Sequence, residues 1–167
     1  MIEGRNATHP LAKRIAPYQT DHPMSNSLYE QDFYAWANEQ AALLRAGQLD
    51  RADIDNIAEE IESMGRSEKR ELVSRLTILL LHLLKWRYRP GLRSRSWHGS
   101  IEVQRHGLDD HLRDNPSLKS RLNEAIKTAY RTARIEAERE TGLARDTFPR
   151  ECPFTFGEMA DQDFWPD

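Results

Sequence analysis

The amino-acid sequence predicts an all-α protein, a single-domain bundle of about five main helices around a central buried helix. Apolar residues recur every three or four positions in successive segments from residue 27 onward, which is the spacing of one helical face. No segment keeps the alternation of apolar and polar residues that is typical of a β-strand. A chain of 167 residues is long enough to form one domain with its own core.

Residues 1–25 are predicted to form an extended N-terminal arm, because Pro10, Pro17 and Pro23 fall in it and no helical spacing persists. The stretch Ile2-Glu3-Gly4-Arg5 resembles the site of a processing protease and is assigned no function. Residues 26–167 are assigned to the helical-bundle domain.

The first two helices are predicted from their caps and stops. Ser27-Leu28-Tyr29-Glu30 has the spacing of a capping box, and Gly47 offers an end to the helix that follows. Asp50 or Asp53 can cap a second helix, for which Gly65 is the expected end. We expect one face of this second helix to be apolar, formed by Ile54, Ile57, Ala58, Ile61 and Met64.

The third helix, from about Ser67 to Tyr88, is predicted to be the central one. Its apolar residues cover most of its circumference, so it must be buried on most sides. Pro90 and Gly91 end it, and its apolar stretch is too short and too polar to span a membrane. The main apolar stripe consists of Leu72, Leu76, Leu79, Leu80 and Leu83.

The remaining chain predicts two further helices and a docked tail. A fourth helix begins at Ser94 or Ser96 and ends at Asn115-Pro116, and a fifth begins at Pro116 or Ser117 and ends at Gly142. The aromatic tail over residues 148–166 carries so much apolar surface that we expect it to pack on the bundle. The fourth helix directs Trp97, Ile101, Gln104, Leu108 and Leu112 inward, and the fifth has a stripe rich in alanine.

Composition and charge limit the class of protein that this chain can be, but they do not indicate what it binds. The 24 Lys and Arg residues nearly balance 27 Asp and Glu, so bulk charge indicates no ligand. The single cysteine, Cys152, cannot form an intrachain disulfide, which excludes a disulfide-stapled secreted scaffold. With no signal-peptide pattern and no long apolar run, we expect a cytoplasmic protein without a membrane partner.

An ordered series of short motifs resembles a bacterial family catalogued only as a domain of unknown function, number twenty-nine. The resemblance covers roughly residues 27–166. It implies an α-helical fold and a bacterial origin, and it implies no activity. The matching stretches are residues 28–36, residues 57–71, His82-Leu83-Leu84-Lys85-Trp86, Ser96-Trp97, Gln104-Arg105, Asn115-Pro116-Ser117-Leu118 and Cys152-Pro153-Phe154.

The segment from Lys85 to Arg105 is basic and interleaved with aromatic residues. Six Lys or Arg side chains against Glu102 alone give it a net charge of +5. Arginine binds phosphate and aromatic rings stack on bases, so the segment is a candidate for nucleic-acid binding. The alternative is internal pairing with residues 50–62, where six acids against Arg51 give −5. The candidate contact residues are Arg87, Arg89, Arg93, Arg95, Trp97 and Arg105.

One pair within this segment suggests an enzyme. Arg93 and His98 resemble the Arg-x4-6-His motif of the HEPN ribonuclease superfamily, whose members are helical bundles. That resemblance implies a metal-independent ribonuclease, in which His98 would transfer a proton and Arg93 would stabilise the phosphorane.

Metal and thiol chemistry have weak support in the sequence. His106 and Asp110 lie four residues apart and so share a helix face, where they are the weak candidates for metal ligands. Glu59 and Glu62 also share a face, but no Glu-x-x-His motif accompanies them. We interpret His82 as a hydrogen-bonded core residue and Cys152 as a small hydrophobic one. No cofactor is expected.

The favoured interpretation is a non-catalytic binding or regulatory module. It would act through protein contacts or self-association, with nucleic acid as a second kind of partner. The alternatives are the HEPN-like ribonuclease using Arg93 and His98, and a purely structural oligomeric scaffold that dimerises through the alanine-rich face of the fifth helix.

Overall fold

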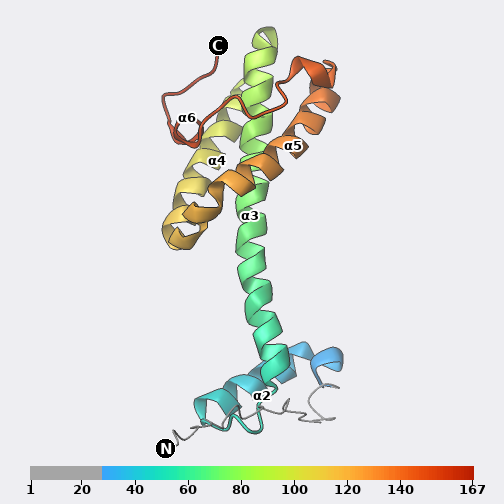
Figure 1. Cartoon of the computed structure of the whole chain (residues 1–167), viewed down its shortest axis with the longest axis vertical. Helices are drawn as coiled ribbons and strands as arrows, with labels where there is room; N and C mark the ends of the chain where they lie inside the picture. Colours follow the sequence, from blue (N-terminus) through green and yellow to red (C-terminus); the bar gives the residue numbers. More distant parts are fainter. Residues whose placement is uncertain (1–27) are drawn as a thin grey trace, which may run out of the picture. The chain divides into compact units, whose positions relative to one another are not determined.

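The computed structural model describes residues 28–167, and all regular elements in this range are helices, which confirms the all-α prediction (Figure 1). The predicted arm and Ser27 lie outside the described residues. Within the described residues the chain divides into two compact units, residues 28–58 and 59–167. No helix within residues 28–167 is long and apolar enough to cross a membrane. The helices are α2 (Phe33–Arg45), α3 (Ile54–Tyr88), α4 (Arg95–Asp114), α5 (Leu122–Thr141) and α6 (Phe156–Ala160), with 3-10 turns η1 (Pro90–Leu92), η2 (Pro116–Arg121) and η3 (Arg145–Thr147).

In the first unit, side chains of α2 form hydrogen bonds with the loop that leads into α3. Asp32 caps α2 by accepting a hydrogen bond from the Ala35 amide at 3.0 Å. The buried Trp36 donates from its indole Nε1 to Asp53 Oδ2 at 3.3 Å, and Gln40 Oε1 accepts from the Asp53 amide at 2.8 Å. Gly47 follows α2 with a φ of +69°, as the predicted stop requires.

The predicted break at Gly65 is wrong, because α3 runs without interruption from Ile54 to Tyr88. Gly65 does not have the left-handed backbone that Gly47 and Gly142 adopt. A glycine inside a helix costs only about 1 kcal/mol relative to alanine, and no proline stands near this one. The strong helix formers around it, mainly Glu, Met, Arg and Lys, therefore keep the helix intact.

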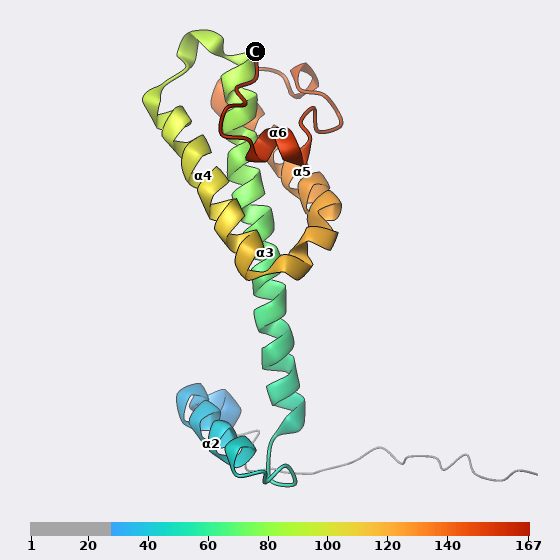
Figure 2. The same ribbon diagram turned by 90° about the vertical axis from the view of Figure 1, so that its left-hand side faces the viewer.

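The second unit has the predicted central helix. In two perpendicular views α4 and α5 flank the C-terminal half of α3 (Figures 1 and 2). Small side chains on α5 let that helix approach closely, as its sequence predicts. The buried residues are Leu72, Leu76, Leu79, Leu80, Leu83 and Leu84 of α3, Ile101, Leu108 and Leu112 of α4, and Ala125, Ala129, Ala133 and Ala137 of α5.

Most of the predicted helix ends in this unit are confirmed. Ser94 caps α4, since its Oγ accepts from the Trp97 amide at 3.3 Å. Pro90 begins η1 one residue after the end of α3, and Gly142 ends α5 with a φ of +68°. One difference is that the segment after Asn115 begins as the 3-10 turn η2, so that the α-helix starts only at Leu122.

The tail packs on the bundle, as predicted: Phe148, Phe154 and Met159 belong to the buried core, and Pro166 is also buried. It contains a short helix, α6, that the sequence analysis did not predict. The signal for it is present in the sequence, because Thr155 and Glu158 form a capping box at the start of α6.

Candidate functional site

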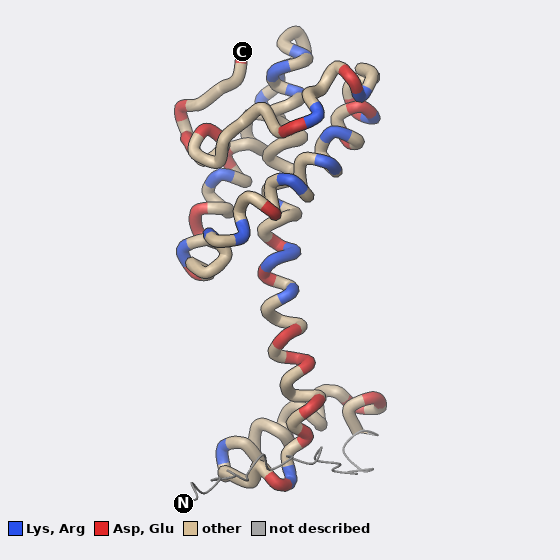
Figure 3. The backbone as a smooth tube through the Cα atoms, in the orientation of Figure 1, with Lys and Arg blue, Asp and Glu red and all other residues tan. Residues whose placement is uncertain are grey.

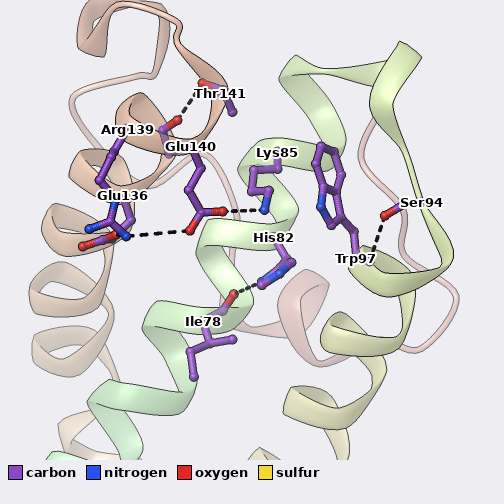
Figure 4. A network of polar contacts seen from close by, with 10 residues as sticks. Ile78, His82, Lys85, Ser94, Trp97, Glu136, Arg139, Glu140 and Thr141 are labelled. Carbon is purple, nitrogen blue, oxygen red and sulfur yellow. Dashed lines mark hydrogen bonds and ion pairs between the residues drawn. The ribbon is translucent and has the colours of Figure 1, made fainter.

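The basic segment is neutralised in part by α5, through its buried first residue, Lys85. Only 7% of Lys85 is exposed; its Nζ donates to Glu140 Oε2 at 2.6 Å and lies 4.5 Å from the centroid of Trp97 (Figure 4). Arg139 contacts both Glu140 and Glu136, which ties this pair to the rest of α5. A carboxylate and a ring face therefore both offset the burial of this ammonium group.

The alternative that residues 50–62 neutralise the basic segment by antiparallel packing is wrong. It required a chain reversal near Gly65, and α3 is continuous there. Glu62 and Lys85 lie on one helix, 23 residues apart (85 − 62), which corresponds to about 35 Å of helix rise. Figure 3 shows acidic and basic residues interspersed along the second unit, so that much of the pairing is local.

Arg105 lies inside the protein and binds the tail. Only 1% of it is exposed, and the guanidinium donates three hydrogen bonds to main-chain carbonyls. Nε donates to Met159 O at 2.9 Å, Nη1 to Gln162 O at 3.2 Å and Nη2 to Phe164 O at 2.6 Å. Burial lowers the pKa of Arg105, while the charges of Asp161 and Glu102 act in the opposite direction. Arg105 is therefore not available on the surface, as a contact residue would have to be.

Arg93 and His98 meet the same tail. Arg93 donates from Nε to Trp86 O at 2.9 Å and from Nη2 to Pro166 O at 3.2 Å. The His98 ring stacks on Trp165 with centroids 4.3 Å apart and an interplanar angle of 12°, and its Nδ1 is 3.0 Å from Glu102 Oε2. Both residues thus contact the tail, and a ribonuclease role for them stays a prediction.

These contacts define a tail-binding site, formed by Trp86, Arg93, His98 and Arg105, and a tail segment, residues 161–167, that occupies it. Trp165 is the central contact: its ring centroid lies 4.7 Å from that of Trp86 and 5.2 Å from the Arg105 guanidinium. The site takes its residues from the end of α3, the loop before α4 and α4 itself. Sequence reasoning selected three of the four, but gave no sign that the tail would cover them.

The other predicted contact residues differ in exposure. Arg89 donates from Nη2 to Thr141 O at the end of α5, and Trp97 is half-buried against Lys85. Arg87 and Arg95 are exposed, and Arg87 lies beside the Tyr88 and Phe154 rings. Within residues 28–167 these two guanidiniums lack the carbonyl bonds that hold the other arginines of the segment.

His82 is half-buried, and its ring Nδ1 donates to Ile78 O at 2.9 Å (Figure 4). Burial lowers the pKa of His82, and nearby Lys85 lowers it further, whereas the bond to Ile78 and the charge of Glu140 raise it. The balance favours the neutral ring in the folded protein. The prediction of a hydrogen-bonded residue is confirmed, although the ring is not fully enclosed.

Protonation of His82 is expected to destabilise the fold at mildly acidic pH. Because the pKa is lower in the folded chain than in the unfolded one, the unfolded chain binds more protons as the pH falls, and folding stability decreases. Urea unfolding at about pH 7.5 and about pH 5.5 should show a smaller loss in His82→Gln than in the wild type. His106→Gln removes an exposed imidazole and is the control. An equal loss in the wild type and His82→Gln would contradict the prediction.

The residues singled out for metal or thiol chemistry have other contacts. Asp110 binds Arg113, and His106 is exposed. No group of three or more His, Cys, Asp or Glu side chains within the described residues is placed to hold a metal ion. Cys152 is half-buried with its thiol directed to Phe154 O at 3.4 Å, and burial raises its pKa, which disfavours the reactive thiolate.

The apolar face predicted for the second helix, now the N-terminal part of α3, includes side chains that are exposed. Ile61 and Met64 are 60% and 62% exposed. The bundle ends on α3 at Glu68 and Lys69, where Asn115 Nδ2 donates to Glu68 Oε2 at 3.2 Å and Lys69 pairs with Glu124 at 2.8 Å. Within the second unit α3 continues past α4 and α5 (Figures 1 and 2).

Comparison with known proteins identifies one related group. The family described as "Domain of unknown function DUF29" matches residues 28–165. No curated protein and no solved structure matches the chain.

Proposed function

Since the chain belongs to the DUF29 family, whose description names no activity, we propose a function from its own contacts: a non-catalytic binding module of the bacterial cytoplasm, regulated by its tail. In this proposal the tail segment is a resident ligand of the tail-binding site and leaves it when an external ligand binds. The cytoplasmic location rests on the lone cysteine.

The observation that carries the proposal is how the tail segment is held. Trp165 packs against Trp86 and His98, and Arg105 donates to the carbonyls of Gln162 and Phe164. Ring stacking combined with main-chain hydrogen bonds is a common way in which proteins hold an extended peptide. The site thus has the chemistry of a receptor for a short segment of chain.

The tail segment also has the features of a part that opens locally. Its four polar residues are exposed, Phe164 and Trp165 are half-buried, and Pro166 is its one buried residue. Phe148, Phe154 and Met159, which come earlier in the tail, are buried in the core. Segments with few buried apolar contacts open at a lower free energy than the core does. Opening after α6 therefore leaves the rest of the tail in place.

A full-length variant with Phe164→Ala and Trp165→Ala tests the proposal, because it weakens the tail segment and leaves the receptor side intact. A labelled peptide of residues 159–167 should bind this variant and bind the wild type at least about tenfold more weakly, since the wild-type site is filled. The matched control is Phe33→Ala with Tyr34→Ala, which removes two exposed aromatic rings from α2.

Two results would overturn the proposal. One is a failure of the peptide to bind the released variant while circular dichroism and urea unfolding show that variant to be folded. The other is RNA cleavage by the wild type that is lost in His98→Ala, which would make the protein a ribonuclease instead.

A further inference from the structure

We propose that the external ligand of the tail-binding site is single-stranded nucleic acid, and that the tail segment imitates it. This inference rests on the proposed function and names the ligand class of the same site. It is carried by three features of the described residues: the charge on the two sides of the contact, the groups that the arginines hold, and the stacking of Trp165.

The charges on the two sides are opposite. The site lies within the segment from Lys85 to Arg105, which has six basic residues and one acid, a net +5. The tail segment has three aspartates, Asp161, Asp163 and Asp167, and no Lys or Arg, a net −3. Asp161 acts electrostatically on Arg105. The segment therefore brings to the site the sign of charge that a nucleic-acid backbone has.

The arginines hold oxygen atoms spaced along a chain. Arg105 donates to Gln162 O and Phe164 O, and Arg93 donates to Pro166 O at 3.2 Å. The oxygens thus come from alternate residues of one continuous segment, which turns at Gln162 and Asp163 and has no regular structure from Phe164 onward. A guanidinium that holds carbonyl oxygens in this way can hold phosphate oxygens, to which it binds more strongly because they are charged.

The stacking of Trp165 resembles that of an unpaired base. Its ring is nearly parallel to the His98 imidazole, 12° apart in plane and 4.3 Å in centroid distance, and Trp86 closes a second side at 4.7 Å. Sequence-tolerant proteins hold single-stranded nucleic acid by stacking successive bases on such rings within a basic groove. Trp165 packs against both rings and not between them, since the centroids of Trp86 and His98 are themselves 6.1 Å apart. A base inside a duplex has both faces covered by its neighbours and cannot stack on His98 in this way, so the inference is specific for single strands.

Two exposed arginines near the tail-binding site could contact a ligand longer than one nucleotide. Arg87 and Arg95 lie among the residues of the site in the sequence, next to Trp86 and two residues after Arg93, and are exposed. Neither makes a carbonyl or carboxylate contact within the described part of the chain. Both are therefore available to contact further phosphates of a strand that has a nucleotide bound at Trp86 and His98. Four of the six contact residues predicted from the sequence then act together, once the tail segment has left.

The test measures binding of a fluorescent oligouridine of about 16 nucleotides by anisotropy. The full-length variant with Phe164→Ala and Trp165→Ala should bind at least about tenfold more tightly than the wild type, since a filled site lowers apparent affinity. A second variant, Asp161→Asn with Asp163→Asn and Asp167→Asn, weakens the same contact without removing a ring. This second variant should also bind oligouridine more tightly than the wild type. It keeps the test decisive if the first variant fails to fold.

Two further measurements identify the groups that bind. In the released background, Arg93→Gln should weaken binding and lower the salt dependence between about 50 mM and about 200 mM by close to one phosphate contact. Arg113→Gln, an exposed arginine at the far end of α4, is the matched control and should change neither. A duplex of the same length should bind more weakly than the single strand.

The outcomes separate this inference from the proposed function. If the released variant binds the tail peptide but not oligouridine, the ligand is a peptide; the inference is then wrong and the proposed function stands. If it binds neither while remaining folded, both are wrong. Oligouridine binding that is equal in the wild type and the released variants, or that is insensitive to Arg93→Gln, also contradicts the inference.

Discussion

Replacing Arg105 with methionine is expected to lower the free energy of unfolding by about 3–5 kcal/mol and to release the tail segment. Three hydrogen bonds from a charged donor to Met159, Gln162 and Phe164 are lost together, and Met159 O loses its donor inside the protein. A bond to a charged group contributes about 1.5–3 kcal/mol, but bonds that share one side chain do not add. A loss of this size is a large share of the stability of a single domain, about 5–15 kcal/mol.

Urea unfolding measures the loss of stability. Digestion with chymotrypsin measures the release of the tail segment, because the enzyme can cut after Phe164; it does not cut after Trp165, which precedes Pro166. Arg105→Lys retains the charge but not the planar fork of donors, so we expect a loss between those of wild type and Arg105→Met. Arg113→Met on the exposed end of α4 is the control, with a change of no more than about 0.5 kcal/mol. Equal losses in Arg105→Met and Arg113→Met would contradict the assignment.

Truncation of Leu80 to alanine is expected to lower the free energy of unfolding by about 2–5 kcal/mol. Leu80 is fully buried in α3 among residues of the core that α4, α5 and the tail complete. The loss combines the transfer of the removed methyl groups to water with the cavity left behind, and a helix packed on several sides cannot move to fill that cavity.

Leu92→Ala is the matched control, because Leu92 is exposed in the turn η1. It makes the same chemical change and should alter stability by no more than about 0.5 kcal/mol. Thermal or urea unfolding of both variants checks the prediction. Comparable losses would mean that Leu80 is not part of a closely packed core.

The buried half of α3 could be predicted because its information is local. Leucines on nearly every side of one helical stretch leave no face for solvent, and Leu76, Leu79 and Leu83 are indeed fully buried. The ends at Pro90, Ser94 and Gly142 were also predictable, because each depends on the conformation or hydrogen bonding of one or two residues.

The N-terminal half of α3 was mispredicted for two physical reasons. Gly65 carries a small helix penalty that its neighbours outweigh, so a glycine without a left-handed backbone is a poor marker of a helix end. The apolar face through Ile61 and Met64 was correctly recognised as a face. An amphipathic pattern gives the direction of an apolar surface but does not say whether the same chain covers it.

The sequence was enough to predict which residues form most of the candidate site, but not which residues they contact. The mixture of arginine and aromatic residues between Lys85 and Arg105 selected Arg93, His98 and Arg105. Their partners lie far along the chain: Arg105 to Phe164 spans 59 residues and Arg93 to Pro166 spans 73. No periodicity links such distant positions, and main-chain carbonyls leave no trace in a sequence because every residue has one.

Because Ile61 and Met64 are exposed, the free energy needed to break backbone hydrogen bonds differs along α3. From Leu72 onward, breaking a backbone hydrogen bond exposes core leucines, so the amides there are protected by the packing of the whole second unit. Around Gly65 the same kind of bond is held by little more than helix propensity, which for a short stretch is marginal in water. One geometrically regular helix thus comprises a region that unfolds only with the domain and another that frays on its own.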